Sequence, residues 1–244
     1  EKPLVVNYDK KSKIEKIINK TKNKIISIYN PPYESHFNKL KKIINQKEAG
    51  KLKYINIFWS DYKKDLYFKS KFNQKNKDNS KNFRFKKNNS DGSILFDSTS
   101  HLIAEMLWIT NKLPKKVYAI SDKKLKPLML KMNFSFNKNL NADVYITCNS
   151  KFKERIYSSF YLTNKKKILL KGNPHELRIK DLNKEKVILI KKFKNVSNPI
   201  NEMVNYLTKN KKPKLDIKQS LQIISILISV EKSFKLNKTV NIKY

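Results

Sequence analysis

The sequence predicts an α/β (α+β) fold, in which a remnant of a doubly wound sheet precedes an open, mainly antiparallel sheet with helices on one face. Three observations predict it. A strand–helix–strand pattern comes first, a series of alternating apolar segments with short turns follows, and amphipathic helices flank that series. Consecutive strands with short turns pair antiparallel, because parallel neighbours need long crossovers. Helices grouped before and after such strands cover one face of the sheet.

The first 30 residues are expected to form the doubly wound piece. Asp9 stands at the N-cap of a predicted helix with an apolar stripe of isoleucines, and residues 24–29 follow as a strand. Two consecutive prolines at 31–32 then break the chain. We therefore place a domain boundary there, so that residues 1–30 form one domain and residues 31–244 form the other.

Residues 31–244 carry the predicted open sheet. Their apolar residues alternate in several short segments, as expected for strands with one buried face. Residues 69–90 are rich in Lys, Asn, Ser and Asp and are expected to form a long surface loop, a kind of segment that often binds ligands. The predicted helices are 33–47, 97–112, 199–208 and 217–234, and the predicted strands are 52–62, 117–121, 128–136, 142–148, 156–162, 168–171, 187–191 and 239–243.

The chain has a formal net charge of +35, from 55 Lys and Arg against 20 Asp and Glu. Such a balance suits a polyanionic partner, and a basic nucleic-acid-binding protein is one interpretation of the sequence. Only three of the basic residues are arginines, however, and arginine is the residue that binds phosphate or guanine with two hydrogen bonds. The lysines are spread over the whole length. We therefore expect weak, salt-sensitive association with polyanions and no specific nucleic-acid partner.

The sequence also restricts other classes of site. The single cysteine, Cys148, excludes an internal disulfide and a Cys-based zinc site, and it lies in an alternating run typical of a strand. No segment approaches the roughly 20 apolar residues of a membrane span, and the first residues lack a signal-peptide pattern. A cytoplasmic protein with no membrane partner and no metal site is expected.

Two short motifs carry most of the functional signal. The chain opens with Glu1-Lys2-Pro3, and about 90 residues later a glycine-containing turn and an apolar run lead to Asp97 and His101, four residues apart. On a helix this spacing places both side chains on one face, where they can touch the same substrate. Imidazole is suited to take the proton of a hydroxyl group, because its unperturbed pKa of about 6.5 lies near neutral pH.

In order and spacing, these motifs resemble those of the Gfo/Idh/MocA oxidoreductases, the family of glucose-fructose oxidoreductase and inositol dehydrogenase. The resemblance implies an N-terminal Rossmann domain that holds NAD(P) and a C-terminal α/β domain that holds the substrate. It implies that His101 is the general acid/base, that Asp97 orients it or binds a substrate hydroxyl, and that Lys2 donates a hydrogen bond or a positive charge to the reacting oxygen. Glu1, Lys2 and Pro3 would also lie at the cofactor.

A dinucleotide site needs a glycine-rich turn between a strand and a helix, where backbone N–H groups approach the pyrophosphate. The sequence has only three glycines, and no two of them are neighbours in such a pattern. We therefore expect that most of the cofactor domain precedes Glu1 and that residues 1–30 are its C-terminal remnant. The chain by itself is expected to be inactive.

Each residue of the two motifs also has a structural interpretation. Lys2 could be one surface charge among many, and His101 could be a satisfied core histidine. Asp97 could serve only as a helix N-cap.

Further candidates come from the segments around these motifs. Asn30, Tyr33 and Arg84 are candidate substrate contacts, although a structural or solvated role is favoured for each of them. His36 and His175 are predicted to be surface histidines.

The sequence therefore predicts the substrate-binding portion of an NAD(P)-dependent oxidoreductase that acts on a hydroxyl or keto group of a sugar, cyclitol or sugar nucleotide. A non-catalytic binding or oligomerisation module of the same fold is the alternative. The resemblance also implies a homo-oligomer, because the exposed sheet face of the family commonly mediates oligomer contacts.

Overall fold

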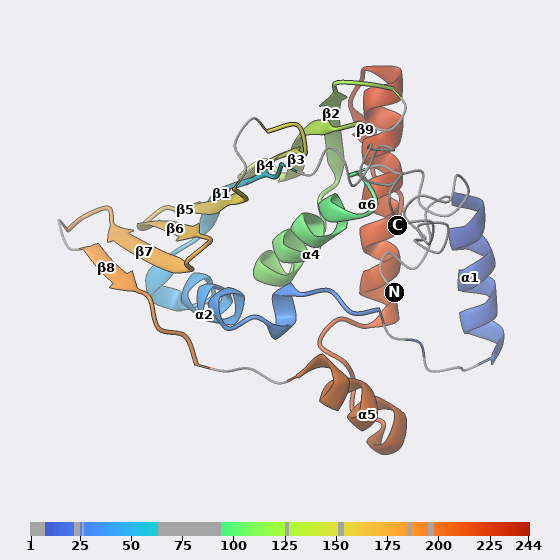
Figure 1. The fold of residues 1–244 in the computed structure, drawn as a ribbon, viewed down its shortest axis with the longest axis horizontal. Helices are drawn as coiled ribbons and strands as arrows, with labels where there is room; N and C mark the ends of the chain where they lie inside the picture. The colour runs from blue at the N-terminus through green and yellow to red at the C-terminus, as the bar shows by residue number, and fades with distance from the viewer. Residues whose placement is uncertain are drawn as a thin grey trace, which may run out of the picture.

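The described residues form one nine-stranded sheet with helices packed on one face (Figure 1). The computed structural model describes residues 8–21, 25, 27–62, 94–124, 127–150, 154–184, 187–194 and 198–244. The strands are β1 (Leu52–Ser60), β2 (Lys116–Ser121), β3 (Met129–Asn137), β4 (Leu140–Thr147), β5 (Ile156–Thr163), β6 (Lys166–Lys171), β7 (Glu176–Asp181), β8 (Val187–Ile190) and β9 (Val240–Asn241). The helices are α1 (Tyr8–Thr21), α2 (Ser35–Ile44), α4 (Ser98–Thr110), α5 (Pro199–Lys209) and α6 (Ile217–Leu236), with short 3-10 turns η1 (Pro31–Tyr33) and η2 (Lys47–Ala49).

The sheet has the strand order β8-β7-β6-β5-β1-β4-β3-β2-β9. It is antiparallel except where β1 and β4 pair in parallel at its centre. The predicted open, mainly antiparallel sheet is therefore confirmed. At the centre of β1 the expected alternation is present, since Ile55 and Ile57 are completely buried while Asn56 between them is half-buried.

Helix α4 lies at the centre of the helix layer and packs against both α2 and α6 (Figure 1). All its residues except His101 and Trp108 are buried. A helix that is apolar on nearly every side is expected to be covered on nearly every side. This burial fixes α4 against the sheet, and the few polar side chains that it carries are therefore held in defined places.

Helix α6 covers the β2 edge of the sheet. It begins with a capping box, in which the Asp216 carboxylate accepts from the Gln219 backbone N–H and the Gln219 side chain accepts from the Asp216 N–H, both at 2.9 Å. Further along, the Ser233 hydroxyl accepts a hydrogen bond from the Ala119 N–H at 2.9 Å. Helix α1 packs against the same helix. No described helix is both long and apolar enough to cross a membrane.

The opposite face of the sheet is not covered by any described helix (Figure 1). Tyr118 and Ile120 of β2 are exposed there, and at the centre the rings of Phe58 and Tyr145 stack with centroids 5.4 Å apart. The same face also carries polar side chains, since the Asp143 carboxylate accepts hydrogen bonds from Tyr54 and Asn133.

The predicted strands differ from the observed ones in two places. The described part of the predicted strand 24–29, residues 25 and 27–29, is not in a strand. Tyr29 is instead completely buried among the helices, because its ring packs beside His101 of α4. Strand β7 was not predicted, since its charged residues obscure the alternation, yet Leu177 and Ile179 are buried and the strand pairs with both neighbours. The predicted loop 69–90 lies outside the described residues.

Candidate active site at the start of helix α4

Helix α4 carries two of the predicted catalytic residues. Asp97 occupies its N-cap position, and His101 lies one turn further along. The Ser100 hydroxyl donates a hydrogen bond to the Asp97 carbonyl oxygen at 2.7 Å, whereas the Asp97 side chain makes no capping hydrogen bond to the described backbone of the helix. The N-cap alternative therefore fits the position of Asp97 but not its carboxylate.

His101 is half-buried beside Tyr29. The two ring centroids are 6.3 Å apart and the ring planes meet at 78°, an edge-to-face arrangement. Tyr29 is completely buried, and this burial raises the pKa of its phenol well above the ordinary value, so the phenol stays neutral. A rigid neutral ring thus limits the movement of the imidazole, while part of His101 remains accessible.

Glu105 continues the same face of α4 one turn beyond His101. Its side chain is 1 % exposed, and its Oε1 accepts hydrogen bonds from the hydroxyls of Tyr157 and Tyr161 on β5, at 2.8 and 2.7 Å. Burial raises the pKa of Glu105 to about 7, although the hydrogen bonds from the two phenols oppose the rise. Burial also raises the pKa of each tyrosine. The buried end of the α4 face is therefore a closed hydrogen-bond network.

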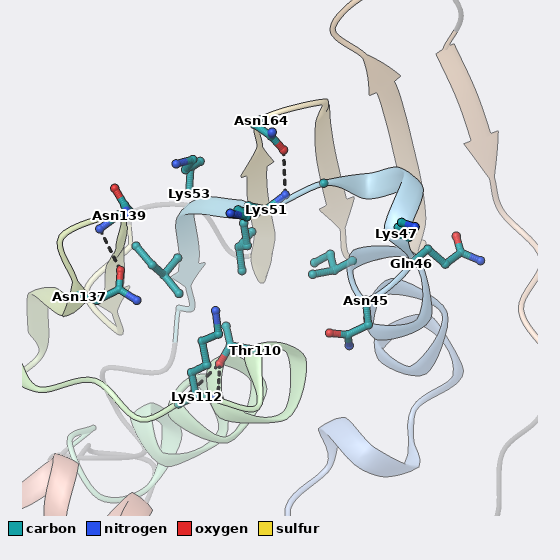
Figure 2. A pocket seen from close by; sticks show the side chains of 14 residues that line it. Asn45, Gln46, Lys47, Lys51, Lys53, Thr110, Lys112, Asn137, Asn139 and Asn164 are labelled. Carbon is teal, nitrogen blue, oxygen red and sulfur yellow. Dashed lines mark hydrogen bonds between the residues drawn. The ribbon is translucent and has the colours of Figure 1, made fainter.

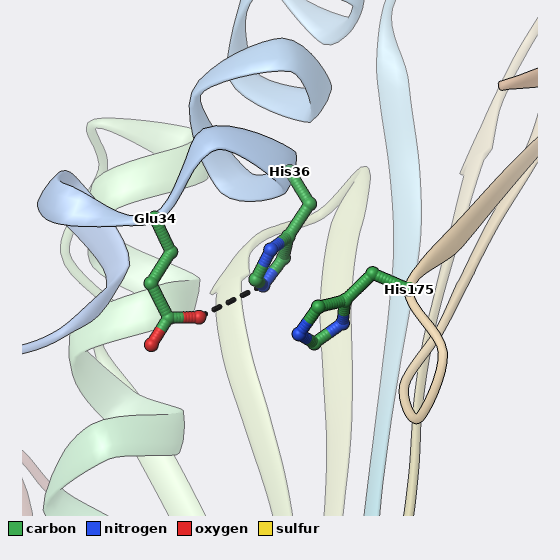
Figure 3. Close-up of side chains that lie close together, drawn as sticks. All are labelled: Glu34, His36 and His175. Carbon is green, nitrogen blue, oxygen red and sulfur yellow. Dashed lines mark ion pairs between the residues drawn. The ribbon is translucent and has the colours of Figure 1, made fainter. Parts of the chain in front are cut away.

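A second polar cluster is formed by Glu34, His36 and His175 (Figure 3). Nε2 of His36 lies 2.9 Å from Oε2 of Glu34, and the two imidazole rings stack with centroids 3.7 Å apart. The contact with His36 lowers the pKa of the Glu34 carboxyl, and the charges of His175 and His101 act in the same direction. The cluster is therefore within electrostatic range of the α4 residues.

The prediction that His36 is a surface histidine is wrong. The residue is only 4 % exposed. Phe37 and Phe193 lie near its ring, at centroid distances of 4.3 and 6.1 Å, and His175 stacks on it. The turn after β6 and the segment after β8 thus cover the side of α2 that the sequence suggests is solvated. His175 itself is exposed, as predicted.

The other predicted site residues divide into two groups. Asn30 is exposed, and its carbonyl oxygen accepts from the Tyr33 N–H at 2.8 Å. The Tyr33 hydroxyl donates a hydrogen bond to Glu202 of α5, and the Lys214 ammonium lies 5.0 Å from the Tyr33 ring centre. Tyr33 thus connects η1 to α5. The residues that lie outside the described part of the chain are Glu1, Lys2, Pro3 and Arg84.

A hollow of about 750 Å³ lies away from these residues (Figure 2). Its lining residues come from the end of α2, η2, the start of β1, the end of α4 and the β3–β4 and β5–β6 turns, and none of them is acidic. Lys47, Lys51, Lys53 and Lys112 contribute its charge. Because α4 is about 20 Å long, the hollow and the predicted catalytic pair lie at opposite ends of the helix.

Sequence reasoning missed Glu105 and the Glu34–His36–His175 cluster. Glu105 has a readable signal, because it repeats the four-residue spacing of Asp97 and His101 on the same helix. Glu34 and His36 are also close in the sequence. His175 carries no such signal, since only the folding of the β6–β7 turn against α2 brings it to them.

NAD(P), the cofactor that the resemblance implies, does not fit on the described residues alone. Gly50 and Gly172 are the glycines among them, and neither opens a helix after a strand as a pyrophosphate site requires. Gly50 instead follows η2 with a φ of 78°, a conformation that few other residues adopt.

Comparison with known proteins agrees with the motifs. A family model described as GFO/IDH/MocA C-terminal domain matches residues 37–168, more than half of the chain. The chain therefore belongs to the Gfo/Idh/MocA family, a family of oxidoreductases.

Solved structures with this fold include two sugar oxidoreductases. Levoglucosan dehydrogenase, in complex with NADH and L-sorbose, superposes with a TM-score of 0.80 at 11% identity, over 99% of this chain and 72% of that chain. Aldose-aldose oxidoreductase from Caulobacter crescentus, complexed with glycerol, superposes with a TM-score of 0.78 at 11% identity, over 99% of this chain and 70% of that chain. No curated protein sequence matches. At these identities the likeness is one of fold.

Proposed function

We propose that this chain is the substrate-binding part of an NAD(P)-dependent oxidoreductase that acts on a hydroxyl or keto carbon of a sugar, cyclitol or sugar nucleotide. The observation that carries the proposal is the placement of Asp97 and His101 at the start of the central helix, in a chain of an oxidoreductase family. The solved structures with bound L-sorbose and glycerol support a polyhydroxylated substrate.

His101 is the general acid/base in this proposal. Its half-exposed imidazole takes the hydroxyl proton of an alcohol substrate, and it returns a proton to the oxygen of a ketone in the reverse direction. Asp97, one turn away, orients the imidazole or accepts a hydrogen bond from a second substrate hydroxyl. Lys2 donates a hydrogen bond or positive charge to the reacting oxygen. NAD(P), when bound, exchanges hydride with the same carbon.

The division of the protein follows from the same proposal. Residues 31–244 form the substrate-binding and oligomerisation domain, and residues 1–30 are the C-terminal remnant of the nucleotide-binding domain. Glu1, Lys2 and Pro3 then lie at the cofactor. The uncovered sheet face, with its stacked Phe58 and Tyr145, is the surface expected to join two copies. Sedimentation of the full-length protein as a monomer at micromolar concentration would argue against this surface.

The test measures NAD(P)-linked oxidation of a panel of inositols, aldoses and sugar nucleotides by the full-length gene product. His101→Asn should lower kcat by about 10²- to 10⁴-fold, as expected for loss of a general base. Asp97→Asn should reduce kcat less, because it misorients the imidazole without removing it. The matched control is Lys235→Gln, which removes only an exposed ion pair with Glu231 on α6 and should leave kcat unchanged.

Near-normal turnover of the His101→Asn variant would refute the proposed mechanism. A separate measurement addresses the cofactor. Titration of residues 1–244 with NAD(P)H in a calorimeter should give no tight complex, because the sequence lacks a glycine-rich phosphate turn. Tight binding would contradict the proposal that residues 1–244 lack most of the nucleotide-binding domain.

A further inference from the structure

The Glu34–His36–His175 cluster has the composition and spacing of a metal site. Each residue offers one ligand atom, a carboxylate oxygen or an imidazole nitrogen, and these atoms all lie within 4.8 Å of one another. Figure 3 shows that Glu34 and His36 come from the start of α2 and that His175 approaches from the turn before β7. Two elements far apart in the sequence thus bring three metal-binding groups together.

His36 supplies a second, independent observation. Its side chain is 5 % exposed, and its buried Nε2 lies 2.9 Å from Glu34 Oε2, a contact that also lowers the pKa of the Glu34 carboxyl. A buried polar atom in a native structure ordinarily has a hydrogen-bond partner. Here that partner is the Glu34 carboxylate, so two of the three ligand atoms are already adjacent.

We propose that Glu34, His36 and His175 form a binding site for a divalent transition-metal ion of the zinc class. Nothing in this inference depends on the proposed oxidoreductase activity. Two imidazoles and one carboxylate are the donor set of three-ligand zinc sites, which keep a fourth position for water or a substrate oxygen. Imidazole donors favour Zn²⁺ and its neighbours in the first transition row over Mg²⁺, which prefers oxygen ligands.

The distances allow such an ion after a small movement. With metal–ligand distances of about 2.1 Å, two ligand atoms of a tetrahedral zinc site lie about 3.4 Å apart. The atoms in the cluster therefore need to approach one another by at most about 1.4 Å. His36 is buried and fixed, whereas Glu34 is half-buried and His175 is exposed. Rotation of these two side chains about the fixed imidazole can close the site.

The cluster lies near the polar residues of α4. Glu34 lies within electrostatic range of both His101 and Glu105 on α4. A divalent ion held there adds positive charge close to the predicted catalytic pair. The same ion offers an open coordination position for an oxygen atom, since the chain supplies only three ligands from this cluster.

The experiment titrates the metal-free 244-residue chain with Zn²⁺ by calorimetry and with Co²⁺ by visible absorption, since Co²⁺ reports tetrahedral coordination by its d–d bands. A 1:1 complex is expected with either ion, and no comparable complex with Mg²⁺. Glu34→Gln and His175→Gln should each weaken Zn²⁺ binding by at least about tenfold, because removing even an outer partner of a metal ligand has an effect of this size. Neither residue belongs to the buried core, so both variants should fold.

Glu176→Gln is the matched control. Glu176 is the next residue after His175, its carboxylate pairs with Arg178 and Lys191, and it does not belong to the cluster. This variant should bind Zn²⁺ as the unmodified chain does. The proposal is overturned if the unmodified chain binds no stoichiometric Zn²⁺ or Co²⁺, or if Glu34→Gln and His175→Gln bind as tightly as Glu176→Gln.

Discussion

The polar face of α4 and the Glu34–His36–His175 cluster lie within electrostatic range of each other, yet their buried polar groups differ in access to solvent. On α4, the buried Glu105 accepts two phenol hydrogen bonds and is closed to solvent. In the cluster, the buried His36 pairs with the half-buried carboxylate of Glu34 and stacks on the exposed ring of His175.

The difference separates polar groups that hold the fold from polar groups that can take a ligand. A buried group whose hydrogen bonds are all made within the protein resists change, because each removal leaves a desolvated partner. A group with an open direction and exposed neighbours can accept a new partner with little cost to the fold. On this criterion Glu105 is structural, and the cluster is a functional candidate.

The largest expected effect on stability concerns Glu105. Its pKa is raised from 4.5 to about 7 by burial, so the folded state holds a proton that the unfolded state releases. The stability from this group is fully present below about pH 4.5 and is lost as pH rises through about 7. Glu105→Gln keeps an acceptor for both phenols but cannot ionise. The unfolding free energy of the variant, relative to that of the unmodified protein, should therefore rise by about 3 kcal/mol between pH 4.5 and pH 8.

Urea unfolding of both proteins across this pH range measures the difference. Glu231→Gln, on an exposed ion pair of α6, should show little pH-dependent difference, because such pairs contribute about 0 to 1 kcal/mol. A constant difference between Glu105→Gln and the unmodified protein from pH 4.5 to pH 8 would show that Glu105 titrates normally. Burial of Glu105 would then not distinguish it from the Glu34–His36–His175 cluster.

The second prediction tests the hydrogen bonds themselves. Tyr161→Phe removes one of the two phenol donors and leaves the buried carboxylate with a lost partner, which should cost about 1 to 3 kcal/mol of unfolding free energy. Tyr244→Phe is the control, since its hydroxyl donates to the Pro114 carbonyl from a partly exposed position and should contribute about 0.5 to 1 kcal/mol. Equal losses in the two variants would mean that the buried hydrogen bond to Glu105 contributes no more to the unfolding free energy than the partly exposed bond of Tyr244.

The sequence predicts the local features of this molecule better than the assembled ones. The mainly antiparallel sheet, the position of α4 and the placement of Asp97 and His101 one turn apart all follow from periodicities of two and four residues in the sequence. Strand β7 was missed because its outer side chains are charged, so that only Leu177 and Ile179 signal a buried face.

The cluster could not be predicted because it depends on tertiary contacts. His36 stands in the first turn of α2, where a polar residue ordinarily faces water, and only the approach of His175 and Phe193 buries it. Tyr29 shows the same limitation, since an alternating segment was expected to form a strand but its ring enters the helix layer instead. Single-sequence patterns carry no information about which distant segments cover a helix.

The smallest effect is expected in the cluster, and it completes the comparison. His175→Gln, in the absence of metal, should change the unfolding free energy by less than about 1 kcal/mol, because the side chain is exposed and contributes mainly a ring contact with His36. The measurement is urea unfolding in the presence of a chelator. Addition of Zn²⁺ should then stabilise the unmodified protein and leave the variant almost unchanged, since an ion that binds only the folded state stabilises it by mass action. A loss above about 2 kcal/mol without metal would instead place His175 with Glu105 among the groups that hold the fold, because exposed side chains rarely have effects of that size.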